Sequence, residues 1–147
     1  MGKLGAKKLY FNIMKEKDIQ IIFGKKNTIT GCFELKLSKG ISIRFDAVRP
    51  HQMKALKDVN SGKGLYHKIN DPIFAGSKTR FASRKPFDCF LLREVLSYIV
   101  VCFYIPYKPK EFIYIKPKMW EKLEEESDKK SIRKEELIKN SNYYLKI

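Results

Sequence analysis

The stretch Thr28-Ile29-Thr30-Gly31-Cys32-Phe33-Glu34-Leu35-Lys36-Leu37 decides the fold that we expect for this chain. Its β-branched and apolar residues predict a well-buried strand over residues 28–37. Glu34 and Lys36 are two residues apart, so they point to the same face of that strand. A carboxylate can bind Mg²⁺, and a neighbouring ammonium can hold a phosphate or an attacking water. The alternative is an exposed polar stripe, but a buried Glu–Lys pair needs a reason.

Turn and periodicity signals outward from this strand predict a mixed sheet flanked by helices, in the α/β or α+β class. The β-rich segment Asp18–Phe23 precedes it, joined by a hairpin turn at residues 24–27. Further strands are expected at residues 41–45, 65–69, 97–104 and 111–115. Helices are expected at residues 2–17, 50–59 and 118–130. A polar, basic loop is expected at 71–86, an apolar segment at 87–92, and a short helix or extended tail at 135–147.

Length and composition predict one domain over residues 1–147, because 44% of the residues are apolar. Its core is expected within residues 1–120, followed by a C-terminal helical tail at 121–147. The chain holds 31 Lys and Arg against 16 Asp and Glu, a net charge of +15. A surface of this sign attracts polyanions such as nucleic acid. A lysine-rich solvated surface from an AT-rich genome is the plain alternative.

Three cysteines, Cys32, Cys89 and Cys102, occur singly in apolar runs. We interpret them as small buried hydrophobic residues rather than zinc ligands. Together with the lack of a signal peptide, this predicts a reducing, cytoplasmic location. The longest apolar run, residues 95–106, is too short to span a bilayer, so no membrane partner is expected.

The candidate site combines Glu34 and Lys36 with an upstream carboxylate. Hydrolysis of a phosphodiester needs an in-line hydroxide and neutralised charge on phosphorus, which one or two Mg²⁺ ions held by carboxylates supply. Antiparallel pairing would bring Asp18, at the start of the preceding strand, close to Glu34. Asp18 and Glu34 would then bind the metal, with Lys36 orienting water or phosphate. Glu16 is the other upstream candidate, and capping of a loop is the alternative role for Asp18.

His51 and Gln52 open the helix that follows the third expected strand. Gln52 can reach the water at the metal or orient Lys36. His51 is expected to cap the helix or contact phosphate, with a general-base role less favoured. Asp46 fits a loop or cap.

Basic residues outside this cluster are expected to contact the nucleic-acid backbone, which Lys and Arg bind without regard to sequence. The predicted set, which includes His51, is Lys7, Lys8, Lys25, Lys26, His51, Lys78, Arg80, Arg84 and Lys85. For residues 78–85 the alternative is a mobile solvated loop. Asp88 follows Pro86-Phe87 but no E-x-K follows it at strand distance, so we predict a structural role for Asp88.

The order of these features resembles the PD-(D/E)xK nuclease superfamily. More narrowly, it resembles RecU-type Holliday-junction resolvases, the penicillin-binding-protein-related factor A family. The resemblance runs in order over about residues 16–120. It is carried by Asp18, Phe33-Glu34-Leu35-Lys36, Ile43-Arg44-Phe45, His51-Gln52-Met53-Lys54-Ala55-Leu56, Pro86-Phe87-Asp88, residues 97–101, residues 112–115 and Trp120. Lys17 stands where the family has Pro before the Asp.

The resemblance implies a restriction-endonuclease-like sheet with Asp18, Glu34, Lys36 and Gln52 as the catalytic set. It also implies Mg²⁺, with Mn²⁺ as a substitute, and a homodimer that cuts four-way DNA junctions in recombination or repair. The short N-terminal region fits a minimal phage or viral version. Strands 97–104 and 111–115 are expected at the dimer interface or in the ordinary core. The alternatives are a homing or repair endonuclease of the same fold and a non-catalytic basic DNA-binding protein.

Overall fold

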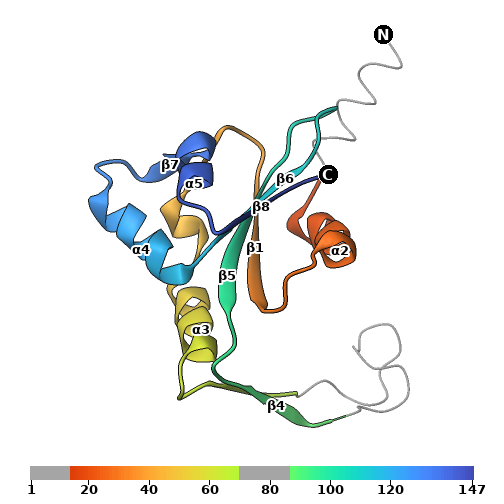
Figure 1. The fold of residues 1–147 in the computed structure, drawn as a ribbon, viewed down its shortest axis with the longest axis vertical. Helices are drawn as coiled ribbons and strands as arrows, with labels where there is room; N and C mark the ends of the chain where they lie inside the picture. The colour runs from red at the N-terminus through yellow and green to blue at the C-terminus, as the bar shows by residue number, and fades with distance from the viewer. Residues whose placement is uncertain (1–13, 70–86) are drawn as a thin grey trace.

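A four-stranded mixed sheet forms the centre of the computed structural model, which describes residues 14–69 and 87–147 (Figure 1). The strands in spatial order are β1 (Cys32–Ser38), β5 (Ser97–Phe103), β6 (Glu111–Ile115) and β8 (Tyr143–Lys146). β1 and β5 are parallel, whereas β5–β6 and β6–β8 are antiparallel. The predicted α+β class is therefore confirmed, as are the strands expected at 97–104 and 111–115.

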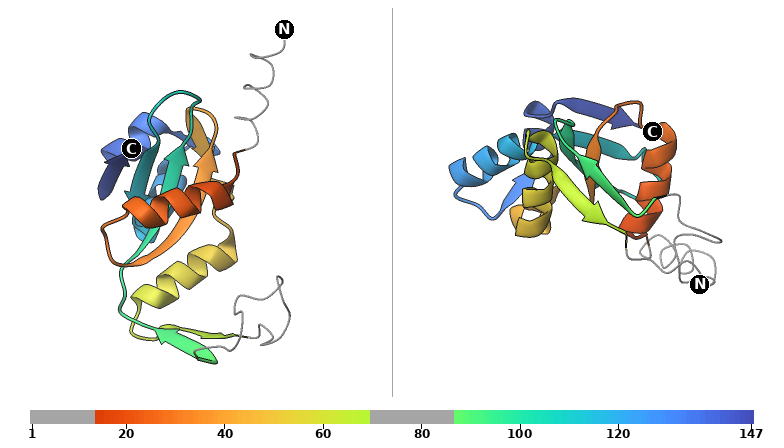
Figure 2. Two further views of the ribbon diagram at one scale, coloured as in Figure 1. Left: turned by 90° about the vertical axis from the view of Figure 1, so that its right-hand side faces the viewer. Right: turned by 90° about the horizontal axis from the view of Figure 1, so that it is seen from below.

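Helices cover both faces of this sheet (Figures 1 and 2). One face carries α2 (Glu16–Lys26). The other face carries three helices, α3 (Pro50–Asn60), α4 (Pro117–Glu126) and α5 (Lys134–Lys139), and the short 3₁₀ helix η1 (Phe45–Ala47). Pro50 and Pro117 each occupy the first turn, where proline costs no hydrogen bond. The helix predicted at 50–59 is confirmed.

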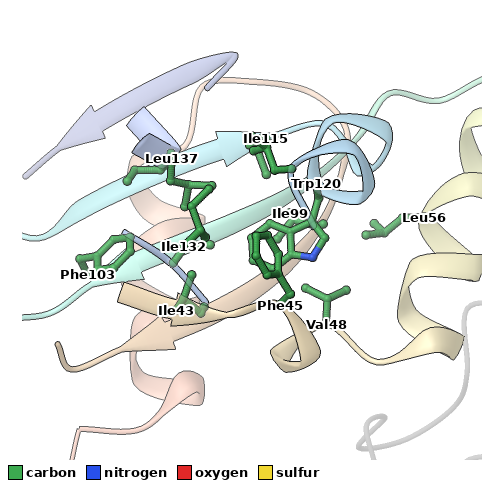
Figure 3. Close-up of a cluster of buried hydrophobic side chains, with 13 residues drawn as sticks. Ile43, Phe45, Val48, Leu56, Ile99, Phe103, Ile115, Trp120, Ile132 and Leu137 are labelled. Atoms are coloured by element: carbon green, nitrogen blue, oxygen red, sulfur yellow. The ribbon is translucent and has the colours of Figure 1, made fainter. Parts of the chain in front are cut away.

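Strand alternation divides the core into two apolar clusters, one on each face. On one face, Ile99, Val101 and Phe103 of β5 pack against α3 and against Trp120 of α4, as Figure 3 shows in part. On the other face, Tyr98, Val100 and Cys102 pack against α2. Every residue of β5 is buried. Of the two roles expected for strands 97–104 and 111–115, the structure therefore supports ordinary core.

Two small sheets complete the described fold. β2 (Ser42–Arg44) pairs with β7 (Ser131–Arg133) beside the α3–α4 layer. β3 (Leu65–Lys68) pairs with β4 (Cys89–Leu92) as an antiparallel arm, which extends beyond one end of the central sheet (Figure 2). The loop expected at 71–86 lies outside the described residues.

The strand predicted at Asp18–Phe23 is wrong, because these residues lie within α2. Alternation of Ile19, Ile21 and Phe23 fits a strand, but Ile21 is 63% exposed in the structure. Ile19 and Phe23 are buried four residues apart, which is the spacing of one helix face. The expected hairpin turn at 24–27 is likewise replaced by the last turn of the helix.

The tail predicted at residues 121–147 is helical only in part, in the end of α4 and in α5. β8 adds a fourth strand to the central sheet, and β7 forms the separate two-stranded sheet with β2. Leu137 of α5 is fully buried and Ile132 of β7 is 3% exposed, both in the cluster around Trp120. Residues 121–147 therefore belong to the core layer. Within residues 14–69 and 87–147, no helix combines the length and apolarity that crossing a membrane requires.

Candidate active site

Glu34 and Lys36 lie side by side on β1, as the sequence predicts. In the parallel register Glu34 is beside Ile99 and Lys36 is beside Val101, so both point to the face covered by α3. Lys36 Nζ lies 3.0 Å from Glu34 Oε1. The Lys36 side chain is 9% exposed and that of Glu34 is 27% exposed. The pair is thus a buried ammonium held by a carboxylate that reaches the surface.

Gln52 fixes the carboxylate from the first turn of α3. Its Nε2 donates a hydrogen bond to Glu34 Oε1 at 2.8 Å, and its Oε1 accepts one from the backbone N of Arg49 at 2.9 Å. The second bond is the reciprocal contact made by a polar residue at the third position of a helix. Gln52 was expected to reach water or to orient Lys36, and in the structure it contacts Glu34.

A groove opens in front of Glu34, with a volume of about 310 Å³. One wall is formed by β1 and α3 and includes His51, which is exposed. The opposite wall is the β3–β4 arm, represented by Phe90 and Leu92. Glu34 and Gln52 therefore face a space that is open to solvent and is wide enough for a ligand.

Asp88 is an exposed residue directly before β4, the strand whose Phe90 and Leu92 line this groove, and is not itself one of the lining residues. Strand alternation puts Asp88 on the same face as Phe90 and Leu92. Its backbone O accepts a hydrogen bond from Ile69 N at 2.8 Å, and Ile69 is 4% exposed. Asp88 thus continues the row of Phe90 and Leu92. A structural role was predicted for Asp88 because no E-x-K motif follows it in the sequence. The E-x-K motif of this chain, Glu34-Leu35-Lys36, instead comes before Asp88.

Asp18 is separated from Glu34 by the sheet. α2 packs on the face that carries Leu35, whereas Glu34 and Lys36 point to the opposite face. The Asp18 carboxylate instead accepts a hydrogen bond from Lys15 N at 2.9 Å. It makes the same capping contact at α2 as Gln52 makes at α3. The predicted convergence of Asp18 and Glu34 is therefore wrong, and Glu16, on the same helix, shares that face.

The predicted phosphate-contacting residues divide into three groups. His51 lines the groove. Lys25 and Lys26 are exposed in the last turn of α2, the helix on the face opposite Glu34. The others lie outside the described residues: Lys7, Lys8, Lys78, Arg80, Arg84 and Lys85. Asp46, expected in a loop or cap, pairs with Arg44 at the surface.

The cysteines follow the sequence expectation only in part. Cys102 is buried in β5, and burial raises the pKa of its thiol to about 12. Cys32 is half-buried, whereas Cys89 is exposed on the arm. The apolar neighbours of Cys89 predicted burial, but a two-stranded arm has one face without a covering layer.

The donor set at the groove suits a hard cation that keeps most of its own water. Among residues 14–69 and 87–147, no three His, Cys, Asp or Glu side chains are placed to hold a metal ion together. Mg²⁺ in phosphate-transferring sites is often bound through one or two carboxylates plus water and substrate oxygens. Glu34, with Oε1 held by Lys36 and Gln52, offers such an oxygen ligand. Glu34 thus offers one carboxylate oxygen of the kind that Mg²⁺ or Mn²⁺ binds.

Comparisons with protein-family models, curated proteins and solved structures find no match to this chain.

Proposed function

We propose that this protein is a Mg²⁺-dependent DNA endonuclease whose active site contains Glu34, Lys36 and Gln52. The observation that carries the proposal is the buried Lys36 ammonium, 3.0 Å from a carboxylate that faces an open groove. Burial of a charge is costly, so a fold that needed only packing would be better served by an apolar residue at 36. In the structure Glu34 is the partner of this ammonium, and a substrate phosphate held at Glu34 would bring a second anionic oxygen to it.

The three side chains have separate tasks in phosphodiester hydrolysis. Gln52 holds the Glu34 carboxylate in one orientation by hydrogen bonding from the helix start. Lys36, fixed by its neighbours, donates its N–H groups to a phosphate oxygen or to the attacking water. His51 is on the first turn of α3, where the positive end of the helix also favours phosphate. A bound Mg²⁺ would add Lewis-acid activation of water and neutralise charge on the phosphate.

Glu34 and Asp88 are the carboxylates that would hold the cation. Glu34 lines the groove, and Asp88 comes directly before β4, whose Phe90 and Leu92 line its other wall. This pair would replace the Asp18–Glu34 pair expected from the sequence. This assignment also keeps Asp18 for the capping contact that it makes with Lys15. The net charge of +15 supports a nucleic-acid substrate.

The resemblance to RecU-type resolvases makes a four-way junction the first substrate to test. Cutting two strands symmetrically requires two active sites, so a homodimer is part of the proposal. A homing or repair endonuclease of the same fold, and a DNA-binding protein without catalysis, are the competing functions.

The test is cleavage of a labelled four-way junction and a linear duplex of the same sequence, with Mg²⁺ or with EDTA. The wild type should nick the junction in symmetric pairs with Mg²⁺ only, and Glu34→Gln should abolish the nicks. Glu126→Gln, in an exposed ion pair on α4, is the matched control and should cut normally.

The other outcomes separate the competing functions. Equal cutting of the duplex would replace the resolvase by a general or homing endonuclease. Binding of DNA without any cleavage under Mg²⁺ or Mn²⁺ would overturn the enzymatic proposal and leave a DNA-binding protein.

A further inference from the structure

The β3–β4 arm has two chemically different faces. The row that contains Phe90 and Leu92 continues through the paired backbone to Asp88. Glu94 lies beyond the end of β4 at Leu92 and has a φ of +55°, so it belongs to neither row. The outer row holds apolar and basic residues and none that is acidic. Its members, with Phe87 at the arm's end, are Tyr66, Lys68, Phe87, Cys89, Leu91 and Arg93.

The apolar part of the outer face is a directly opposed pair. Tyr66 and Leu91 are cross-strand partners in the register, at 64% and 58% exposure. Phe87, at the same end of β4 as Cys89, is 51% exposed. Side chains of this size are rarely left uncovered together unless a surface has a binding task. Lys68 and Arg93, both exposed, border the pair.

We propose that the outer face of the arm binds unpaired bases of a nucleic-acid strand, such as those at a branch point or in a single-stranded segment. Tyr66 would stack on a base and Leu91 would support it, while Lys68 and Arg93 would contact the flanking phosphates. Aromatic residues between basic ones, without carboxylates, are the usual composition of such surfaces. Two copies of this chain would bring their basic borders together, so charge favours nucleic acid over self-association.

Gly64, directly before β3, has a φ of +79° and packs closely against Leu92 and Arg93. The outer face is turned away from the Glu34 groove, so the two faces can contact different segments of one molecule. Binding by the arm stands independently of catalysis. Its contribution to substrate choice rests on the proposed nuclease function.

The test is the affinity of Tyr66→Ser and Leu91→Ser for three DNA probes in EDTA: a four-way junction, single-stranded DNA and a linear duplex. Each substitution should weaken junction and single-strand binding by about tenfold and duplex binding by less than about threefold. Ile21→Ser, which changes a 63% exposed residue on α2, is the control and should leave all three unchanged. Bound single-stranded DNA should also protect exposed Cys89 from alkylation.

Three outcomes would overturn the inference: unchanged affinities, an equal loss in Ile21→Ser, or an arm substitution that turns a dimer into a monomer while DNA binding stays intact. The last would identify a second copy of the chain as the partner. Because the assay is run in EDTA and does not measure cleavage, a wild type that binds through the arm but never cuts would refute only the nuclease proposal.

Discussion

At the scale of single residues, the Glu34–Lys36 pair is the most informative part of the molecule. Removing one member of a buried pair leaves the other charge without a partner, which costs more than breaking an exposed pair. Here the Glu34 side chain lines the groove and is 27% exposed, whereas the Lys36 side chain beside it is 9% exposed. The two residues should therefore respond differently to substitution.

We predict that Glu34→Gln lowers the free energy of unfolding by about 1–3 kcal/mol, because Lys36 stays buried without a counter-charge. Glu126→Gln breaks a pair whose side chains are 61% and 63% exposed, and should cost less than about 0.5 kcal/mol. Urea denaturation without metal measures both. Equal stability of Glu34→Gln and wild type would show that Lys36 is not held by its ion pair.

A second residue-scale prediction separates the two aspartates. Asp88→Asn should weaken Mg²⁺ binding in a calorimetric titration by about tenfold or more, because it removes the second carboxylate that we propose for the cation. Asp18→Asn should leave the Mg²⁺ affinity unchanged and cost about 0.5–1 kcal/mol of stability through its cap. If Asp18→Asn weakened Mg²⁺ binding and Asp88→Asn did not, Asp18 and not Asp88 would be the metal ligand.

At the scale of elements, the strand and helix around the site could be predicted, whereas the upstream element could not. Glu34 and Lys36 alternate with Leu35 and Leu37, and Pro50 signals a helix start, so local pattern and fold agree there. The apolar residues between 18 and 23 fit the two-residue repeat of a strand as well as the 3.6-residue repeat of a helix. The choice of helix comes from tertiary packing of Ile19 and Phe23, which the local sequence does not contain.

The groove wall formed by the arm was beyond sequence reasoning for a different reason. Leu65–Lys68 and Cys89–Leu92 are 20 residues apart in the chain, and their register decides which face Asp88 shares. A strand at 65–69 could be predicted, but its partner could not. Once the pairing is known, alternation from Phe90 to Asp88 follows directly.

The arm gives the element-scale prediction. In Gly64→Ala, the new Cβ would lie 2.8 Å from both Leu92 O and Arg93 Cβ, at a φ that L-residues disfavour. We expect a loss of roughly 1–3 kcal/mol in stability and faster amide exchange in β3 and β4. Gly40→Ala, where a Cβ meets nothing within 4 Å, is the control and should change neither. Unaltered exchange in Gly64→Ala would show that this glycine does not hold the arm.

At the scale of the whole molecule, the C-terminal segment closes the sheet through one carboxylate. Glu111 of β6 accepts hydrogen bonds from Lys134 Nζ at 2.8 Å and from Tyr144 OH. Burial is the largest single effect and would raise the pKa of Glu111, but the two bonds and the charges of Lys134 and Lys146 together outweigh it and hold the pKa below its ordinary 4.5. Burial and the bond to Glu111 raise the pKa of Tyr144 to about 12. The three residues thus tie α5 and β8 to the centre.

This arrangement gives stability a predictable dependence on acid. A carboxyl group with a lowered folded-state pKa stabilises the fold fully above its unfolded pKa, and the contribution is lost as pH falls through the folded value. Between about pH 6 and about pH 3, wild type should lose more Tm than Glu111→Gln. Glu125→Gln, at an exposed position of α4, should follow the wild type. If the Tm of wild type and of Glu111→Gln fell equally with pH, Glu111 would not be the source of the acid sensitivity.

The central claim is that the ammonium buried at Lys36 serves cleavage of a phosphodiester rather than the fold. The single-turnover rate of junction cleavage by Lys36→Met with Mg²⁺, beside its unfolding curve, tests it most directly. We predict a rate at least about 10²-fold below wild type, with cooperative unfolding retained, because the group that stabilises developing charge is gone while its volume is filled. A variant that folds and cuts at the wild-type rate would contradict the account.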